Sequence, residues 1–300
     1  MSSGLYLIKS KLGWILNGRL ETQLSSPYDA ELSFFNNEYR LEQDFWNLEH
    51  IGIRDSPYEN DDDKALETFN KTILFDKNRY YVTWPWKEMK PNLPSNYNLA
   101  LGRLKSQLKT FKNDEDRRDK YDGLIQEQMK KGIIEMVAGN TSNLVHYIPH
   151  HAVVTPQHTT TKVPIVYDAS AKTKKENLSL NECLYRGPVL LEDLCGILLR
   201  FRKHKIAIIA DIEKAFLQVG LQEKDRDVTR FLWLKNPEKM DTEENLQVYR
   251  FTRVPFGVIS SPFLLAATVS YHLRQDGSPV ATDISQNIYV DNVISGRETI

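Results

Sequence analysis

Cysteine is scarce in this 300-residue chain, which also has no long hydrophobic run and almost no net charge. Its two cysteines, Cys183 and Cys195, lie apart with no secretory segment before them, which argues against a disulfide framework or a zinc site. No apolar stretch approaches the length of a membrane span. The opening residues also lack the apolar core of a signal peptide. We therefore expect a soluble, intracellular protein with no membrane partner.

The formal net charge of −1 gives no overall basic footprint of the kind that nucleic-acid-binding proteins usually carry. Basic residues are grouped locally instead, in one cluster around 200–205 and in a second group over 103–112. Such groups form either a solvated surface or a contact with phosphate, and the sequence leaves both interpretations open.

A continuous apolar run, Ile206–Ala210, is rich in β-branched residues and predicts a strand buried on both faces. The run ends at Asp211, and a helix-compatible segment follows it. Aspartate at this position either caps the next turn or holds a metal ion.

A second stretch, eighty residues later, predicts a hairpin: two short β-prone runs over 287–296 flank the pair Asp291-Asn292. Both residues suit a tight turn because they tolerate positive φ. Such a hairpin would present Asp291 where it can meet Asp211.

Between these stretches lies Arg253-Val254-Pro255-Phe256-Gly257, which is followed by a helix start at Ser260-Ser261-Pro262. Glycine in this turn allows the backbone to approach another group closely. Three such segments in this order are far more specific than any one of them alone.

In these three segments the chain resembles the palm motifs of reverse transcriptases, most closely those of the BEL/Pao class of long-terminal-repeat retrotransposons. The resemblance extends upstream through three further segments. These are Leu93–Ser106, Thr161–Lys172 and Asn181–Pro188. Residues 12–18 are similar to the closing segment of that family's retropepsin-like protease.

The resemblance implies an α+β fold with reverse-transcriptase-like fingers and palm, an antiparallel sheet with packed helices. It implies four regions in chain order. These are a protease remnant over 1–38, a linking region of helices and a hairpin over 39–111, fingers over 112–204, and a palm over 205–300 that ends before a thumb. Protease activity is not expected, because no Asp-Thr-Gly or Asp-Ser-Gly triplet is present.

Local patterns predict the following elements. Helices are expected over 38–51, 97–111, 114–131, 189–204 and 262–273, a hairpin over 72–84, and strands over 5–8, 12–16, 145–148, 152–155, 163–167 and 247–252. The aromatic residues of the hairpin are interpreted as packing rather than as a stacking surface for bases. Four histidines, His146, His150, His151 and His158, lack the spacing of a zinc site.

By this resemblance the chemistry is nucleotide addition supported by two Mg²⁺ ions, with Mn²⁺ as a substitute. Asp211, Asp291 and the carbonyl of Ile212 are the expected metal ligands. Asn292 stands beside them, where the family usually has a second aspartate. Phe216 matches the residue that excludes a 2′-hydroxyl by steric clash. Phe256 and Gly257 would line the other side of the nucleotide, and Lys162 is a candidate contact to the triphosphate.

Two departures favour a second hypothesis, a retroelement-derived remnant that at most binds nucleic acid or a partner. Asn292 replaces a charged ligand by a neutral one. Pro164 stands where the family tends to have an arginine that binds the nucleotide. The expected partners are an RNA or DNA template with its primer and a deoxynucleoside triphosphate. The thumb, RNase H and integrase regions would be separate, and the expected location is the cytoplasm, a virus-like particle or the nucleus.

Overall fold

The computed structural model describes residues 4–10, 13–19, 59–137, 144–153, 164–239 and 243–298. Side chains are described from residue 61 onward. The chain divides into two units, Met1–Pro57 and Tyr58–Ile300.

The first unit contains an antiparallel hairpin, formed by β1 (Gly4–Ser10) and β2 (Gly13–Arg19). The strands expected over 5–8 and 12–16 are therefore confirmed. The helix expected over 38–51 lies outside the described residues.

The second unit begins with a helix, a hairpin and two long helices. These are α2 (Glu59–Thr72), β3 (Leu74–Asp76), β4 (Arg79–Val82), α3 (Tyr97–Phe111) and α4 (Glu115–Lys130). Lys77 and Asn78 join the two strands with φ of 47° and 58°, the left-handed conformation that a type I′ turn requires. Helix α4 follows Asp114, whose side chain accepts a hydrogen bond from the backbone N–H of Arg117. The expected hairpin and both long helices are confirmed.

The larger of two neighbouring small sheets contributes several residues to the core. Its strands, in spatial order, are β10 (Arg230–Leu234), β11 (Leu246–Phe251) and β5 (Ile134–Met136). Every residue of β10 is buried, and the rings of Phe111 and Tyr121 on α3 and α4 pack against Trp233. The second sheet pairs β6 (His150–Ala152) with β7 (Ile165–Tyr167) and contacts β10 through ring packing.

The sequence patterns predict only some of the strands around this core. β11 and β7 fall where strands are expected, whereas residues 145–148 form no strand and β6 begins at His150. The sequence patterns do not predict β10, although every residue of this strand is buried.

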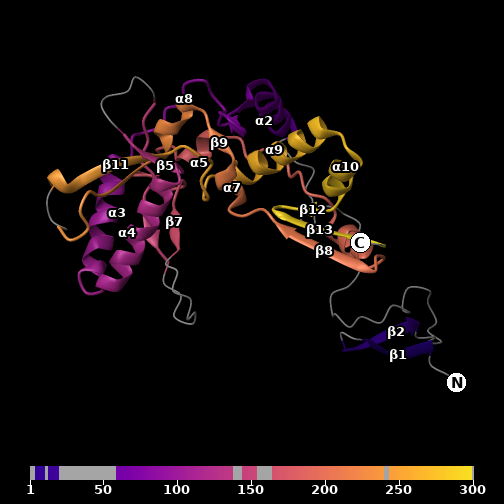
Figure 1. The fold of residues 1–300 in the computed structure, drawn as a ribbon. Coiled ribbons are helices and arrows are strands. Elements are labelled where there is room, and N and C mark those ends of the chain that lie inside the picture. The colour runs from indigo at the N-terminus through magenta and orange to yellow at the C-terminus, as the bar shows by residue number, and fades with distance from the viewer. Residues whose placement is uncertain are drawn as a thin grey trace, which may run out of the picture. The chain divides into compact units, whose positions relative to one another are not determined.

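The palm-like part contains a three-stranded antiparallel sheet in the order β12 (Ile288–Tyr289), β13 (Asn292–Arg297) and β8 (Ile206–Asp211) (Figure 1). Helices α6 and α10 contact β13. The remaining elements are α5 (Leu180–Cys183), α6 (Leu194–Phe201), α7 (Ala215–Gln218), β9 (Gly220–Leu221), α8 (Glu223–Arg226), the 3-10 turns η1 (Asp227–Thr229) and η2 (Glu243–Asn245), α9 (Ser261–Asp276) and α10 (Pro279–Gln286).

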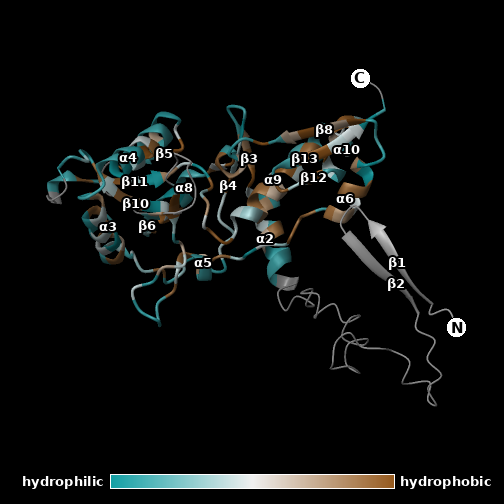
Figure 2. Ribbon diagram, turned by 90° about the horizontal axis from the view of Figure 1, so that it is seen from below, coloured by the Kyte–Doolittle hydropathy of each residue, from teal (hydrophilic) through white to brown (hydrophobic). Residues whose placement is uncertain are grey.

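Two expectations for this part were wrong, and one helix was not expected. β8 is not buried on both faces: it is the edge strand, with Ile208 and Ile209 exposed by 42% and 69%. Its apolar residues, and those of α6, are evident in Figure 2. The helix expected over 189–204 covers only α6, because Asp193 caps its start and the residues before it are extended. Helix α10 was not anticipated.

The fold class is confirmed as α+β, with small, mainly antiparallel sheets and packed helices. Within the described ranges, no helix has both the length and the apolar character needed to cross a membrane.

Candidate active site

The hairpin that carries Asp291 turns at Val290-Asp291, one residue earlier than expected. Ile288 pairs with Val293 and Tyr289 pairs with Asn292, so Asn292 is the first residue of β13 rather than part of the turn. Val290 has a φ of 60°, which a β-branched residue rarely adopts and which costs about 1–3 kcal/mol. This local strain lies at the residue immediately before Asp291.

β8 places Asp211 beside this turn. The Cα partner of Asp211 across the ladder is Asn292, and the backbone N–H of Ile212 donates to the carbonyl of Asp291 at 2.9 Å. Directly opposed residues of an antiparallel ladder project from the same face. Asn292 is therefore the cross-strand neighbour of Asp211, and Asp291 lies one residue away in the adjoining turn.

The donor set at this point suits a hard cation such as Mg²⁺, because it consists of carboxylate and carbonyl oxygens. Asp211 is exposed and Asp291 is half-buried, so both carboxylates are accessible. The amide of Asn292 donates to Oδ1 of Asp291 at 2.9 Å. In the part of the chain that the structure describes, no group of three or more His, Cys, Asp or Glu residues could hold a metal ion. Asp211 and Asp291 thus bring two acidic residues to this end of the sheet, fewer than such a group contains.

Two aromatic rings meet next to this sheet. The rings of Phe216 and Phe256 lie 4.5 Å apart at 51°, and Phe216 also packs partly on the core. Phe256 is 54% exposed, so its ring is available to a ligand. The structure therefore brings together two of the residues expected at the nucleotide.

Gly257 has a φ of 91°, and a Cβ there would lie 2.3 Å from the carbonyl oxygen of Tyr167. Only glycine fits this close approach. The close neighbour is the β7 backbone, so the glycine joins the turn to the fingers-like sheets.

Asn181 holds the same turn from the other side and was not singled out from the sequence. Its side-chain amide donates to the carbonyl of Gly257 at 3.4 Å, and its Oδ1 accepts the backbone N–H of Ile259 at 2.8 Å. Helix α5, which carries Asn181, begins with a capping box between Ser179 and Glu182. The Ser-x-x-Glu spacing was a readable signal for this helix.

A cavity of about 220 Å³ adjoins Phe256 and is lined by residues of α4, β7 and the segment that follows β8. Two of its lining residues, Gln128 and Tyr167, have a buried side-chain oxygen with no hydrogen-bond partner among the described residues. Burial raises the pKa of the Tyr167 hydroxyl, which stays protonated and able to donate.

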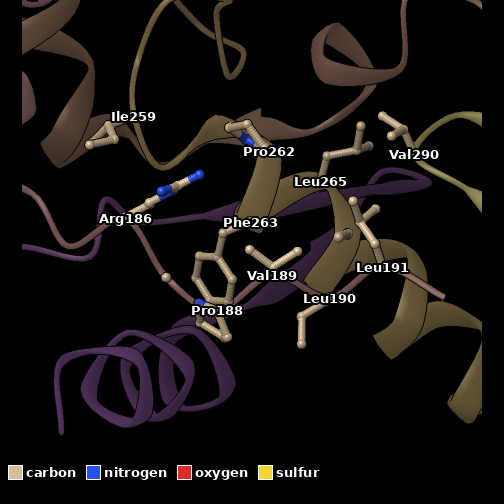
Figure 3. A pocket seen from close by; sticks show the side chains of 12 residues that line it. Arg186, Pro188, Val189, Leu190, Leu191, Ile259, Pro262, Phe263, Leu265 and Val290 are labelled. Carbon is tan, nitrogen blue, oxygen red and sulfur yellow. The ribbon is translucent and has the colours of Figure 1, made fainter. Parts of the chain in front are cut away.

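A second cavity, of about 180 Å³, lies against the hairpin turn and is almost wholly apolar (Figure 3). Val290 and Leu265 lie at one side and Arg186 at another, with Phe263 of α9 between them. Residues 186–191 form one wall of this cavity. They pass so close to Phe263 that a Cβ at Gly187 would lie 2.3 Å from its ring.

Two buried histidines serve the core. Nδ1 of His146 contacts the carbonyl of Pro94 at 2.6 Å, and Nε2 of His150 contacts the carbonyl of Leu232 at 2.8 Å. Burial lowers the pKa of both imidazoles, that of His150 to about 4. Both imidazoles therefore bind backbone carbonyls within the core, whereas His151 is exposed and His158 lies outside the described residues.

The remaining expected contacts have different outcomes. Lys162 lies outside the described residues. Pro164 continues the β6–β7 ladder through its carbonyl, which accepts the N–H of Val153 at 3.0 Å. Arg200, from the basic cluster before β8, is half-buried and donates to the side chain of Asn287 at 3.1 Å.

Comparison with known proteins gives one family match. Residues 153–297, just under half of the chain, match the family model described as reverse transcriptase (RNA-dependent DNA polymerase). The expectation of a reverse transcriptase domain is supported over these residues, which include Asp211, Phe256 and Asp291. No curated protein matches the sequence.

Among solved structures, similarity is found to two foamy viral protease–reverse transcriptase complexes. One, described as a dRH form in complex with double-stranded DNA, is 20% identical with a TM-score of 0.44, and the match covers 60% of this chain and 26% of that chain. The other, in complex with an RNA/DNA hybrid, is 20% identical with a TM-score of 0.42, and the match covers 61% of this chain and 20% of that chain. The chain thus spans about a quarter or less of the length of these proteins.

Proposed function

We propose that this chain supplies the fingers and palm of an RNA-directed DNA polymerase from a retroelement. The observation that carries the proposal is the β8–β13 pairing, which places the Asp211 strand end against the Asp291 turn within the matched region. The proposed finer identity is a BEL/Pao-class polyprotein segment. The β1–β2 hairpin includes the residues that resemble the end of a retropepsin-like protease.

In this proposal Asp211, Asp291 and the carbonyl of Ile212 hold two Mg²⁺ ions. When bound, these ions favour ionisation of the primer hydroxyl and neutralise charge on the phosphates. The chain's own part is positioning. Phe216 lies under the sugar and excludes a 2′-hydroxyl, while Phe256 and Gly257 bound the nucleotide from the opposite side.

The apolar cavity beside Val290 suits the template. Its apolar wall accepts the flat surface of a nucleotide, and Arg186 at its side offers a cation to a phosphate. The partners proposed are therefore an RNA or DNA template with its primer and a deoxynucleoside triphosphate.

A second candidate function is a non-catalytic remnant that binds nucleic acid without extending it. The observation that favours it is Asn292, which lies opposite Asp211 and brings no charge to the place nearest that carboxylate. Pro164 adds to this, because it offers no side chain to a nucleotide.

Primer extension on an RNA template, with Mg²⁺ and separately with Mn²⁺, tests the proposal. We expect extension that Asp211→Ala abolishes and that Asn292→Asp increases by about tenfold, because a carboxylate there adds an attractive charge within bridging distance of the ions. Gln286→Glu is the matched control, since it adds the same charge at an exposed residue of α10 that does not pair with β8. Extension that survives Asp211→Ala would exclude the metal assignment, and no extension by Asn292→Asp would favour the remnant.

A further inference from the structure

A third cavity, of about 190 Å³, is lined largely by cations. Arg79 on β4, Lys131 after α4, Lys214 before α7 and Arg253 after β11 all line it, and Glu213 is its one acidic lining residue. These side chains come from four segments that are distant in the sequence and converge on one small space.

The two arginines of this cavity have no carboxylate partner among the described residues. Arg79 donates to the backbone carbonyl of Gln218 and, at 3.4 Å, to its side-chain oxygen. Burial and the nearby cations Arg79 and Arg226 lower the pKa of Arg253. A hydrogen bond to the Tyr81 side chain offsets part of this decrease. Among the described residues, neither guanidinium therefore forms an ion pair with a carboxylate.

The two lysines share a single carboxylate. Oε1 of Glu127 lies 2.6 Å from Nζ of Lys131 and 3.2 Å from Nζ of Lys214. With Glu127 and Glu213 both counted, four positive charges face two negative ones, which leaves a net charge of +2. Such an excess in a partly buried cavity favours a bound anion.

The backbone holds the arginines in place. Tyr81 of β4 pairs with Gly220 of β9, and Gly220 in turn bridges to Arg253. A Cβ at Gly220 would lie 2.5 Å from the Tyr81 ring, so the strands are in close contact. The cationic side chains therefore start from a rigid frame, which lowers the ordering cost of binding.

We propose that this cavity binds a compact polyphosphate anion, of the pyrophosphate class, with Arg79 and Arg253 as its principal ligands. A small multivalent anion fits because the cations converge on one cavity of about 190 Å³ rather than following an extended track. Planar guanidinium groups also bind phosphate oxygens in pairs. The choice of pyrophosphate rests on the proposed function, since nucleotide addition releases it and Lys214 lies three residues after Asp211.

Calorimetric titration with inorganic pyrophosphate tests this site in the presence of EDTA, so that the carboxylate site contributes no metal-mediated binding. We expect saturable binding by the unmodified chain, weakened at least about tenfold by Arg79→Gln and by Arg253→Gln, because each removes a charge-assisted contact. Arg79→Lys keeps the charge and should lose less. Arg274→Gln is the matched control, because Arg274 is exposed on α9 and does not line the cavity.

Thermal melting identifies any variant that fails to fold. Lys131→Gln then replaces that variant in the titration, because Lys131 is an exposed residue of the cavity lining. Pyrophosphate binding that none of these variants weakens would overturn the assignment. Arginine-dependent binding of single-stranded oligothymidylate without binding of pyrophosphate would overturn it too. Pyrophosphate binding that persists in a chain unable to extend a primer would contradict the proposed polymerase function and leave the anion site standing.

Discussion

Acidification should destabilise this protein through His150, which is buried among the rings of the core. Its exposed fraction is 4%, its Nε2 contacts the carbonyl of Leu232 at 2.8 Å, and its Nδ1 contacts the hydroxyl of Tyr121. Because Nε2 faces a carbonyl, that nitrogen carries the proton, and Nδ1 accepts from the tyrosine. A second proton, at Nδ1, would require the Tyr121 hydroxyl to accept rather than donate, and it would place a charge in an apolar core.

The size of the effect follows from the two pKa values. Burial lowers the pKa of His150 to about 4 from an ordinary value of 6.5. Below pH 6.5 the unfolded chain therefore binds a proton that the folded chain does not, so the free energy of unfolding falls as the pH falls from 6.5 toward 4. A difference of this size costs about 2 kcal/mol at pH 5 and about 3 kcal/mol at pH 4.

Urea unfolding at pH 7.5 and at pH 5 measures this loss, and the chain offers a matched pair of variants. His150→Gln removes the buried titrating group, whereas His151→Gln removes its exposed neighbour. We expect the unmodified chain and His151→Gln to lose about 2 kcal/mol between the two pH values. His150→Gln should lose much less, with a remainder from His146, whose pKa burial also lowers. An equal loss in His150→Gln would refute the reasoning.

Two further predictions concern backbone and charge. Gly257→Ala should destabilise the chain by about 2 kcal/mol or more, because the new Cβ would meet the Tyr167 carbonyl. Urea unfolding measures this loss, with Gly102→Ala as the control, because a Cβ at Gly102 would meet no atom within 4 Å. An equal loss of stability in both variants would contradict the prediction. Asp227→Asn should cost about 3–5 kcal/mol, because it leaves the charge of Arg230, now 2.7 Å from that carboxylate, uncompensated. A loss below about 1 kcal/mol would contradict this, because it would show that Arg230 does not depend on the Asp227 charge.

The sequence predicted long or locally determined elements well. Helices α3 and α4 were readable because their apolar residues recur at helical spacing, and the turn at Lys77-Asn78 because its residues tolerate positive φ. The palm motifs were readable because Asp211 and Asp291 stand at strand ends within recognisable patterns.

Tertiary context decided the rest. The apolar run of β8 is the pattern of a buried strand, yet in this chain the strand lies at the sheet edge, and no local signal states which neighbours a strand has. The anion cavity could not be read either, since Arg79 and Arg253 are 174 positions apart by their numbers and meet through β9.

The geometry of the β12–β13 hairpin makes the Asn292→Asp variant a test of charge alone. The turn at Val290-Asp291 keeps a strained φ of 60°, and the backbone bond from Ile212 to Asp291 together with packing of Val290 on the core offsets that strain. None of these contacts uses the side chain of Asn292, whose amide makes one exposed hydrogen bond to Asp291. The scaffold that positions Asp211 and Asp291 is therefore independent of the charge at residue 292. A carboxylate placed there changes the electrostatics of the site without requiring a change in fold, so any gain in primer extension reports on the proposed metal site.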